Sequence, residues 1–395
     1  MKEHEGRYLH ILEIVYGNPL TFPGGLEVYS LNLGVGLTDK GYLVDYAFVK
    51  DPKLKEILKK EDVSINFNKN TSFIEFNIAR FYFYIGLEKL IYSMRLEKFI
   101  SRNLEKYDVI HFNGDNGGSA GKSFPKLKIM TWHGTSNPLF NRYMDKSNFV
   151  LRIRKKMMQR ISFMLERRAS YYADVVTAVS KQLIPEINKI SRKNNVYYTP
   201  ICVNERSSHL LDKNKNIIKE SLGLDVDSIY ALFVGKDPVR KGLDVAVRAI
   251  LASRKIKLIA VTNKVGQYDP LGGRIIFKSS VSIEELNSLY NCCDILVFPS
   301  KAEGFPTVVL EAMKVGLVPI LFDNVAKNIP EIRNGYNSIT VKDEDEFIKA
   351  VKSIEDNSTG LLEMSNNAKS SIVKDYGCQR LADDFDKIIR ENIRK

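Results

Sequence analysis

The sequence predicts an α/β protein made of two doubly wound parallel sheets. Short apolar runs typical of buried strands alternate with segments of helical spacing, which is the pattern of repeated βα units. The 395 residues exceed the length at which one hydrophobic core usually keeps growing, so two domains are expected. A hydrophobic fraction of 44% beside 27% charged residues is ordinary for a soluble globular enzyme.

In the first half, strands are expected at 8–15, 44–49, 109–112, 129–132 and 195–198, and a helix at 27–40. Gly24 and Gly25 follow the first strand. The missing side chains there let backbone amides meet a phosphate or an acceptor, although a tight strand-to-helix turn is the ordinary alternative. A hinge is expected at 200–206, so the first domain covers residues 1–203.

The second half repeats the pattern, and the second domain covers residues 204–379. Helices are expected at 217–222, 243–252 and 283–290, and strands at 230–234, 256–261, 274–277 and 295–298. The last of these strands leads through a Gly/Pro turn into another helix. Such a turn at the carboxyl edge of a parallel sheet builds a ligand site.

Glu303 and Glu311 stand eight positions apart across this turn and helix. Gly304 and Pro306 let a ligand approach the backbone, and the first turn of the helix offers N–H groups that suit a diphosphate. Glu311 is expected roughly two turns into the helix. Alone, the pair would be a capping acid and a solvated surface residue. The helix is apolar nearly all round, however, and a carboxylate inside it needs a partner.

These residues resemble the retaining glycosyltransferases of family 4. Pro299-Ser300, Glu303-Gly304-Phe305-Pro306 and Glu311-Ala312 are similar to the family's Glu-x7-Glu motif and its setting. Four further stretches, 23–27, 131–134, 173–180 and 233–244, resemble other family motifs in the family's order. The resemblance implies the GT-B fold, with two Rossmann-like domains facing a central cleft. It also implies that the last helix, within 380–395, packs back on the first domain.

The resemblance assigns roles to both halves. It implies that Glu303 binds hydroxyls of the transferred sugar, that the amides of Gly304, Phe305, Pro306 and Thr307 assist, and that Glu311 binds the nucleotide ribose. His133 would face the donor sugar, although a lone histidine after a strand is as often structural. The first domain would bind the acceptor and the second the nucleotide-sugar. Configuration would be retained by front-face attack within an ion pair, without a covalent nucleophile.

Four residues after the strand 230–234 are candidates to hold the diphosphate: Gly235, Lys236, Arg240 and Lys241. Sugar transfer builds negative charge on the departing diphosphate, and fixed cations stabilise that charge in the transition state. Many family members have Arg where this chain has Lys236, and Lys cannot make the planar bidentate contact to phosphate. Arg240 is the candidate to supply it. Basic residues in a loop are otherwise usually solvated.

Acceptor contacts are expected in the first domain. His111 ends a strand and precedes a polar, glycine-rich loop in which Asp115 is a candidate base. The segment 149–168 carries an apolar stripe flanked by basic residues. Such a helix either lies on an anionic membrane or packs its stripe on the sheet, and the sequence favours neither. The aromatic segment 73–100 is read as core or as lining of the acceptor site.

The net charge of +12 suggests an anionic partner such as a nucleotide-sugar, a nucleic acid or a membrane surface. The basic residues are not interleaved with an RNA-binding motif, so nucleic acid is disfavoured. No signal peptide or membrane-spanning stretch is recognised, and the four cysteines lack metal-binding spacing. A cytoplasmic protein is expected, with a peripheral contact to the inner face of the membrane as the further option.

The predicted function is a hexosyltransferase-type reaction. A sugar would move from a UDP- or GDP-linked donor to a glycan or lipid-linked acceptor, as in polysaccharide or glycolipid biosynthesis. No metal or other cofactor is expected, because lysines and helix dipoles neutralise the diphosphate and the sequence has no Asp-x-Asp motif. A sugar-nucleotide epimerase of the same fold is the first alternative, and a nucleic-acid-binding protein the second.

Overall fold

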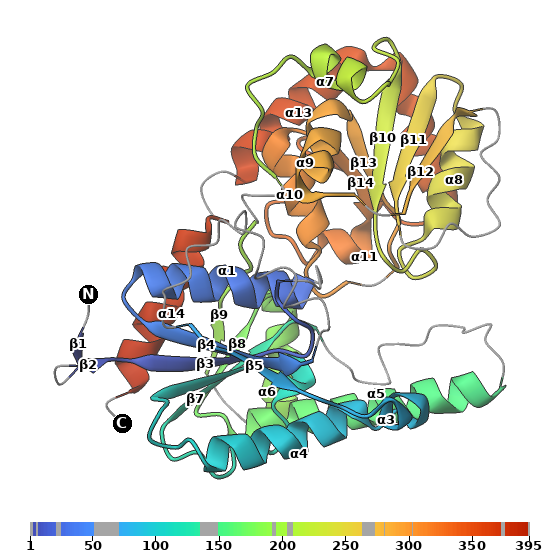
Figure 1. Ribbon diagram of the computed structural model, residues 1–395. Helices are drawn as coiled ribbons and strands as arrows, with labels where there is room; N and C mark the ends of the chain where they lie inside the picture. Colours follow the sequence, from blue (N-terminus) through green and yellow to red (C-terminus); the bar gives the residue numbers. More distant parts are fainter. Residues whose placement is uncertain are drawn as a thin grey trace. The chain divides into compact units, whose positions relative to one another are not determined.

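The computed structural model describes residues 3–4, 7–20, 25–50, 71–134, 149–191, 195–203, 208–262, 273–279, 281–301, 303–372 and 376–393. The chain divides into two compact units. Unit 1 comprises Met1–Cys202 and Cys378–Lys395, and unit 2 comprises Val203–Gly377. Each unit is built around one parallel sheet with helices on both faces (Figure 1). This is the doubly wound arrangement that the sequence predicts.

The sheet of unit 1 has seven strands. Their order is β5 (Phe73–Phe76), β4 (Leu43–Val49), β3 (His10–Ile14), β6 (Val109–Asn113), β7 (Leu127–Trp132), β8 (Val175–Ala178) and β9 (Val196–Tyr198). The chain enters at β3, builds outward through β4 and β5, and then crosses to β6. The strand order therefore reverses between β3 and β6, which is where open α/β sheets bind ligands. A small antiparallel ribbon, β1 (Glu3–His4) and β2 (Arg7–Tyr8), precedes the sheet.

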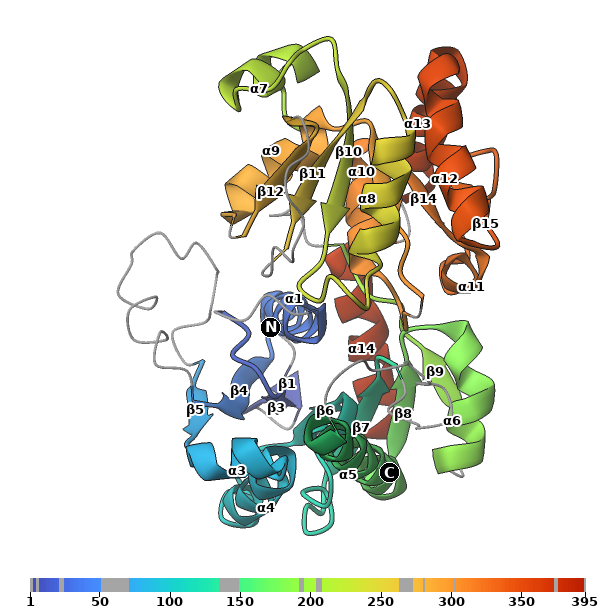
Figure 2. The same ribbon diagram turned by 90° about the vertical axis from the view of Figure 1, so that its right-hand side faces the viewer.

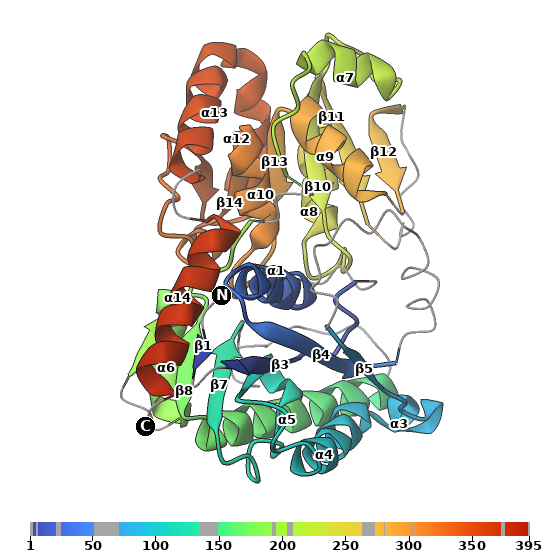
Figure 3. The ribbon, with the colours of Figure 1, turned by 60° about the vertical axis from the view of Figure 1, so that its left-hand side comes forward.

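Two layers of helices cover this sheet. Helices α1 (Gly25–Asp39) and α14 (Cys378–Asn392) lie on one face, and α4 (Glu88–Ser101) and α5 (Phe149–Tyr172) lie on the other (Figures 1 and 3). A Cβ added at Gly36 would lie 2.7 Å from the Cβ of Ala382. The glycine therefore lets α1 approach α14 closely. The other short helices in the described part of unit 1 are α3 (Arg80–Ile85), η1 (Gly114–Asn116), η2 (Lys181–Leu183) and α6 (Ile184–Ser191).

The sheet of unit 2 has six strands. Their order is β12 (Ile275–Lys278), β11 (Ile256–Val261), β10 (Ile229–Val234), β13 (Ile295–Phe298), β14 (Val318–Phe322) and β15 (Ile339–Val341). The central strands are almost continuous apolar runs because both of their faces are buried. The order reverses between β10 and β13, so the loops after these two strands meet at the ligand-binding edge.

Helices also cover both faces of this second sheet. Helices α8 (Leu243–Ala252) and α12 (Glu344–Ser353) pack against each other over one face, with α8 in front of the sheet in Figure 2. Helices α9 (Ile283–Cys292), α10 (Thr307–Val315) and α13 (Ser358–Ile372) cover the other face. The short elements are α7 (Lys215–Ser221), α11 (Asp323–Ala326) and η4 (Ile354–Asp356).

The elements differ from the expected ones in three places. The strand expected at 8–15 is shorter, since Tyr8 pairs in the β1–β2 ribbon and β3 is His10–Ile14. The aromatic segment 73–100 contains β5, α3 and α4, which the sequence reading did not separate. Helix α10 begins only at Thr307, so Glu311 lies about one turn into the helix rather than two.

Candidate active site

The carboxylate of Glu303 contacts three hydrogen-bond donors at the edge of the sheet in unit 2. Its Oε1 atom lies 2.7 Å from Nζ of Lys241 and 2.9 Å from Nη1 of Arg240. Ser300 donates its hydroxyl to the same oxygen at 2.5 Å. Arg240 and Lys241 follow β10, whereas Ser300 and Glu303 follow β13. The two loops at the strand-order reversal therefore bring both cations and the acid together.

Two glycines make room for this cluster. Gly242 adopts φ 76°, and a Cβ there would lie 2.2 Å from the carbonyl oxygen of Pro299. Gly242 thus lets the loop after β10 touch the end of the β13 segment, and it begins α8 as its N-cap. A Cβ at Gly235 would lie 2.9 Å from Cγ of Lys241, so the bare backbone gives the lysine stem its place.

Lys241 is a mostly buried cation. Its Nζ lies 4.9 Å from the centre of the Phe298 ring, and 13% of its side chain is exposed. Burial lowers the pKa of Lys241 below the ordinary 10.5, and Glu303 partly offsets that effect. Arg240 is 43% exposed, and Lys236 is exposed on the surface. Lys241 is therefore the most buried of the three basic residues.

The turn between Glu303 and α10 is held by a side-chain hydrogen bond to its backbone and by the packing of one aromatic ring. Asn328 donates to the carbonyl oxygen of Glu303 at 2.6 Å, and the buried Phe305 ring packs near Tyr376 at 6.0 Å between centroids. Pro306 has no N–H. Among the four residues expected to assist with their amides, only Gly304, Phe305 and Thr307 can donate.

Glu311 is buried in unit 2, with 8% of the residue exposed. Its Oε2 atom accepts a hydrogen bond of 2.9 Å from the hydroxyl of Tyr290, and burial raises the pKa of that tyrosine well above its usual value. Its backbone carbonyl accepts from the Ser208 hydroxyl at 2.5 Å. The carboxylate in this apolar helix thus has a hydrogen-bond partner, as the sequence predicts.

In unit 1, His133 belongs to a polar chain at the sheet's strand-order reversal. Its Nε2 lies 3.0 Å from Oδ1 of Asn113, and Asn113 donates from Nδ2 to Oε2 of the fully buried Glu13 at 3.0 Å. Because the amide nitrogen is used for Glu13, the amide oxygen faces His133. His133 therefore carries its proton on Nε2, which leaves Nδ1 as an acceptor. Burial and the neighbouring His111 lower the pKa of His133 to about 3, so the ring is neutral.

His111 lies inside the sheet and is 1% exposed. Its Nδ1 is 2.7 Å from Oε1 of Glu13, and its Nε2 is 2.7 Å from the Thr131 hydroxyl. The sequence reading named His111 as a candidate acceptor contact. In the structure the buried ring forms a hydrogen bond with the carboxylate that orients Asn113. Asp115 is buried and forms an ion pair with Lys89. This pairing favours a structural role for Asp115 over that of a base.

Two family models match the chain. One, described as Glycosyltransferase Family 4, covers residues 23–204, and one, described as Glycosyl transferases group 1, covers residues 228–357. An uncharacterized glycosyltransferase of Methanocaldococcus jannaschii is 26% identical over 396 residues, which is 95% of this chain and 96% of the relative. The chain is a glycosyltransferase.

Solved structures show that this glycosyltransferase has the GT-B fold. Sucrose-phosphate synthase from Thermosynechococcus elongatus matches with a TM-score of 0.79 and 20% identity, over 97% of this chain and 99% of that one. Anabaena HepE, in a structure that contains UDP-glucose, matches with a TM-score of 0.73 and 15% identity, over 97% and 100%. At these identities the likeness concerns the fold alone.

Sequence reasoning missed several side chains that hold the site of this glycosyltransferase. Ser300 and Asn328 fix Glu303, Tyr290 fixes Glu311, and Glu13 with Asn113 fixes His133. Glu13 lies within a mostly apolar strand, and this position could have indicated a buried acid that needs polar partners. Gly24 lies outside the described residues, whereas Gly25 begins α1. None of the helices in the described segments is long and apolar enough to cross a membrane.

Proposed function

We propose that this glycosyltransferase belongs to the retaining enzymes of family 4. It would move a hexosyl group from a UDP- or GDP-linked sugar to a glycan or lipid-linked acceptor, without a metal ion. The observation that carries the proposal is the convergence of Lys241, Arg240 and Ser300 on Glu303 at the carboxyl ends of β10 and β13. Cations that can neutralise a diphosphate lie there beside an acid that can accept hydrogen bonds from sugar hydroxyls.

The donor is assigned to unit 2 residue by residue. Lys241 and Arg240 hold the diphosphate, with Lys236 as an outer cation and Gly235 giving the backbone access. Glu303 accepts hydroxyls of the transferred sugar, and Glu311 accepts hydroxyls of the ribose. The complex of Anabaena HepE with UDP-glucose supports a nucleotide-sugar as donor. Because the imidazole of His133 is neutral, it contributes a hydrogen bond to the sugar rather than a positive charge.

A screen of nucleotide-sugars by thermal unfolding tests the donor. A ligand that binds only the folded chain raises Tm, and we expect the largest rise with one UDP- or GDP-linked hexose. Retention is tested separately by following donor hydrolysis with proton NMR. An α-linked donor should first release the α-anomer of the free sugar, and early release of the β-anomer would contradict retention. If the chain were instead a sugar-nucleotide epimerase, the same NMR experiment would show an epimerised sugar.

The acceptor side of the proposal includes contact with an anionic membrane through α5. The sequence left two interpretations of α5 open, packing on the sheet and contact with a membrane, and each applies to a different half of the helix. Leu165 near its C-terminal half is buried on the sheet, whereas Ile153 and Met157 in the N-terminal half are 53% and 36% exposed. Basic residues flank the exposed half, and α3 beside it exposes Phe81 and Tyr84. Exposed apolar and basic side chains together suit a peripheral contact on the cytoplasmic face of a membrane.

A further inference from the structure

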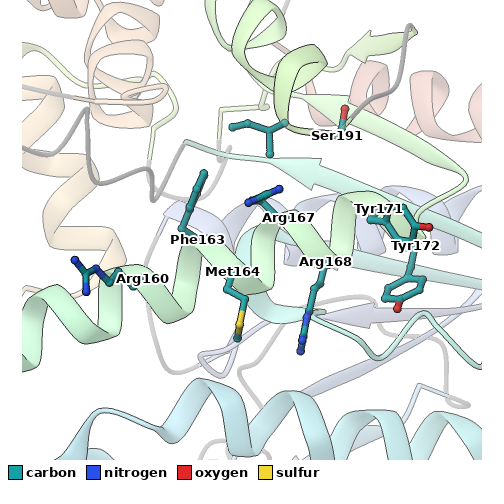
Figure 4. Close-up of a pocket in the computed structure, with 9 residues that line it drawn as sticks. Arg160, Phe163, Met164, Arg167, Arg168, Tyr171, Tyr172 and Ser191 are labelled. Carbon is teal, nitrogen blue, oxygen red and sulfur yellow. The ribbon is translucent and has the colours of Figure 1, made fainter.

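A pocket of about 460 Å³ lies on the outer side of α5, near the end of α6. The residues that line it are Arg160, Phe163, Met164, Arg167, Arg168, Tyr171, Tyr172, Ile190 and Ser191. In the view of Figure 4, the side chains of Phe163 and Arg167 extend from α5 toward Ser191, and those of Met164 and Arg168 extend away from it. None of the residues that line the pocket is among those assigned to the nucleotide-sugar.

The charged residues that line this pocket are all positive. Three of its lining residues are arginines and none is acidic. Arg167 lies over the Phe163 ring at 6.0 Å, and Arg168 reaches the Ser119 hydroxyl at 3.4 Å. In the described part of the chain, none of the three arginines forms an ion pair with an acid. The positive field is therefore available to an anion, and guanidinium groups match the oxygens of a phosphate.

The remaining lining residues are of the kind found at membrane surfaces. Tyr171 is 67% exposed and packs edge-on against Tyr172, with ring centroids 5.2 Å apart. Tyrosine has an apolar ring and a polar tip, which suits the level of lipid headgroups. The pocket also lies on the same helix as the exposed Ile153 and Met157. The pocket and the exposed apolar residues thus belong to one helix, α5.

We propose that this pocket, defined by Arg160, Arg167, Arg168 and Tyr171, binds the phosphate of an anionic lipid headgroup. A phosphomonoester is the best fit, because it carries more negative charge than a phosphodiester and is therefore attracted more strongly by the three arginines. The inference rests on the proposed membrane contact and adds the headgroup chemistry and its site. A lipid headgroup and a soluble phosphate ester both carry a phosphate that could bind here. The test must therefore distinguish the lipid from the soluble ester.

The test compares vesicles that differ in headgroup but not in surface potential. One set contains phosphatidic acid and the other phosphatidylglycerol, adjusted to the same zeta potential in phosphatidylcholine. We expect the unmodified chain to bind the phosphatidic acid vesicles about tenfold more tightly, which corresponds to about 1.4 kcal/mol. The double variant Arg167→Gln/Arg168→Gln should lose this preference. The variant Lys155→Gln/Lys156→Gln should weaken binding to both vesicle types equally and keep the preference.

Controls separate misfolding, charge loss and a soluble ligand. Lys349→Gln/Lys352→Gln removes the same charge from exposed positions of α12 and should change neither vesicle binding nor the preference. Nucleotide binding by each variant reports the fold and the donor site, so a failed donor assignment would show there. Equal binding of the unmodified chain to both vesicle types overturns the proposal. A rise in Tm with glycerol 3-phosphate that Arg167→Gln/Arg168→Gln abolishes, without a vesicle preference, would instead assign the pocket to a soluble phosphate ester and overturn the lipid.

Discussion

Glu303 and Lys241 form an ion pair of 2.7 Å across the two loops that end β10 and β13. The acid thus supplies the counter-charge for a cation that is assigned to the diphosphate of the donor. When a diphosphate binds, it must compete with Glu303 for Lys241 and Arg240. The release of Glu303 from these cations would then leave its carboxylate for sugar hydroxyls. If the assigned roles hold, donor binding and sugar recognition would be coupled through this one carboxylate oxygen.

The two glutamates should respond differently to removal of their charge. Glu303→Gln removes the anion that competes for Lys241, so we expect unchanged or tighter binding of the nucleoside diphosphate but a large loss of sugar transfer. Glu311→Gln should weaken nucleoside diphosphate binding by about tenfold or more, because hydrogen bonds to a charged group contribute about 1.5–3 kcal/mol. Calorimetric titration with the nucleoside diphosphate measures both. Unchanged nucleotide affinity in Glu311→Gln would remove its ribose role.

The lowered pKa of Lys241 predicts the alkaline side of the pH profile. The lysine acts as a cation, and burial lowers its pKa below 10.5. Hence kcat/KM should begin to fall at a lower pH than an ordinary lysine would cause. In Lys241→Arg the guanidinium stays protonated, so the remaining activity should lack this alkaline limb. If the alkaline fall in kcat/KM is unchanged in Lys241→Arg, a group other than Lys241 causes it.

The low pKa of His133 predicts a loss of stability in acid. Its pKa in the folded chain, about 3, lies below the ordinary 6.5. Between these values the unfolded chain binds a proton that the folded chain does not, so the free energy of unfolding falls as the pH drops. The slope from this group is at most about 1.4 kcal/mol per pH unit. Unfolding of His133→Gln should be less sensitive to acid than unfolding of the unmodified chain.

The exposed half of α5 should carry the membrane contact. Arg154 donates to the carbonyl oxygen of Phe83, and Arg160 lines the pocket, so the variant leaves both of these residues in place. Arg152→Gln/Lys155→Gln/Lys156→Gln should weaken binding to anionic vesicles by roughly 100-fold, since each basic residue contributes about 1 kcal/mol. Lys349→Gln/Lys352→Gln/Lys387→Gln is the charge-matched control. If the unmodified chain does not sediment with such vesicles at low salt, α5 is a packing element and a soluble acceptor is favoured.

Much of the fold could be predicted because parallel strands leave a strong local pattern. The run at 295–298 is apolar throughout, and the run at 256–261 is apolar except for Lys257; they coincide with β13 and β11. Strand β5 carries Glu75 and lies at the edge of its sheet, so its four residues give no such signal. The ribbon before β3 depends on pairing between neighbouring short segments, which apolar periodicity does not report.

The site could be predicted only where the chain places its residues close together in sequence. Glu303 and Glu311 share one turn and helix, and Lys241 follows a strand, so their approximate place was readable. That Arg240 and Lys241 both meet Glu303 depends on the neighbouring positions of β10 and β13 in the sheet. The link from Glu13 through Asn113 to His133 likewise joins three strands or strand ends. Such contacts follow from topology rather than from local pattern.

Release of nucleoside diphosphate from the best nucleotide-sugar, compared between Lys241→Ala and Lys236→Ala, tests the central claim most directly. Both variants lose one lysine from the same loop, but only Lys241 is buried against Glu303. We predict that Lys241→Ala lowers the rate by about 100-fold or more, as expected for loss of a group that stabilises charge in the transition state. Lys236→Ala should have a much smaller effect. A folded Lys241→Ala variant that releases the nucleotide at a near-normal rate would contradict the account.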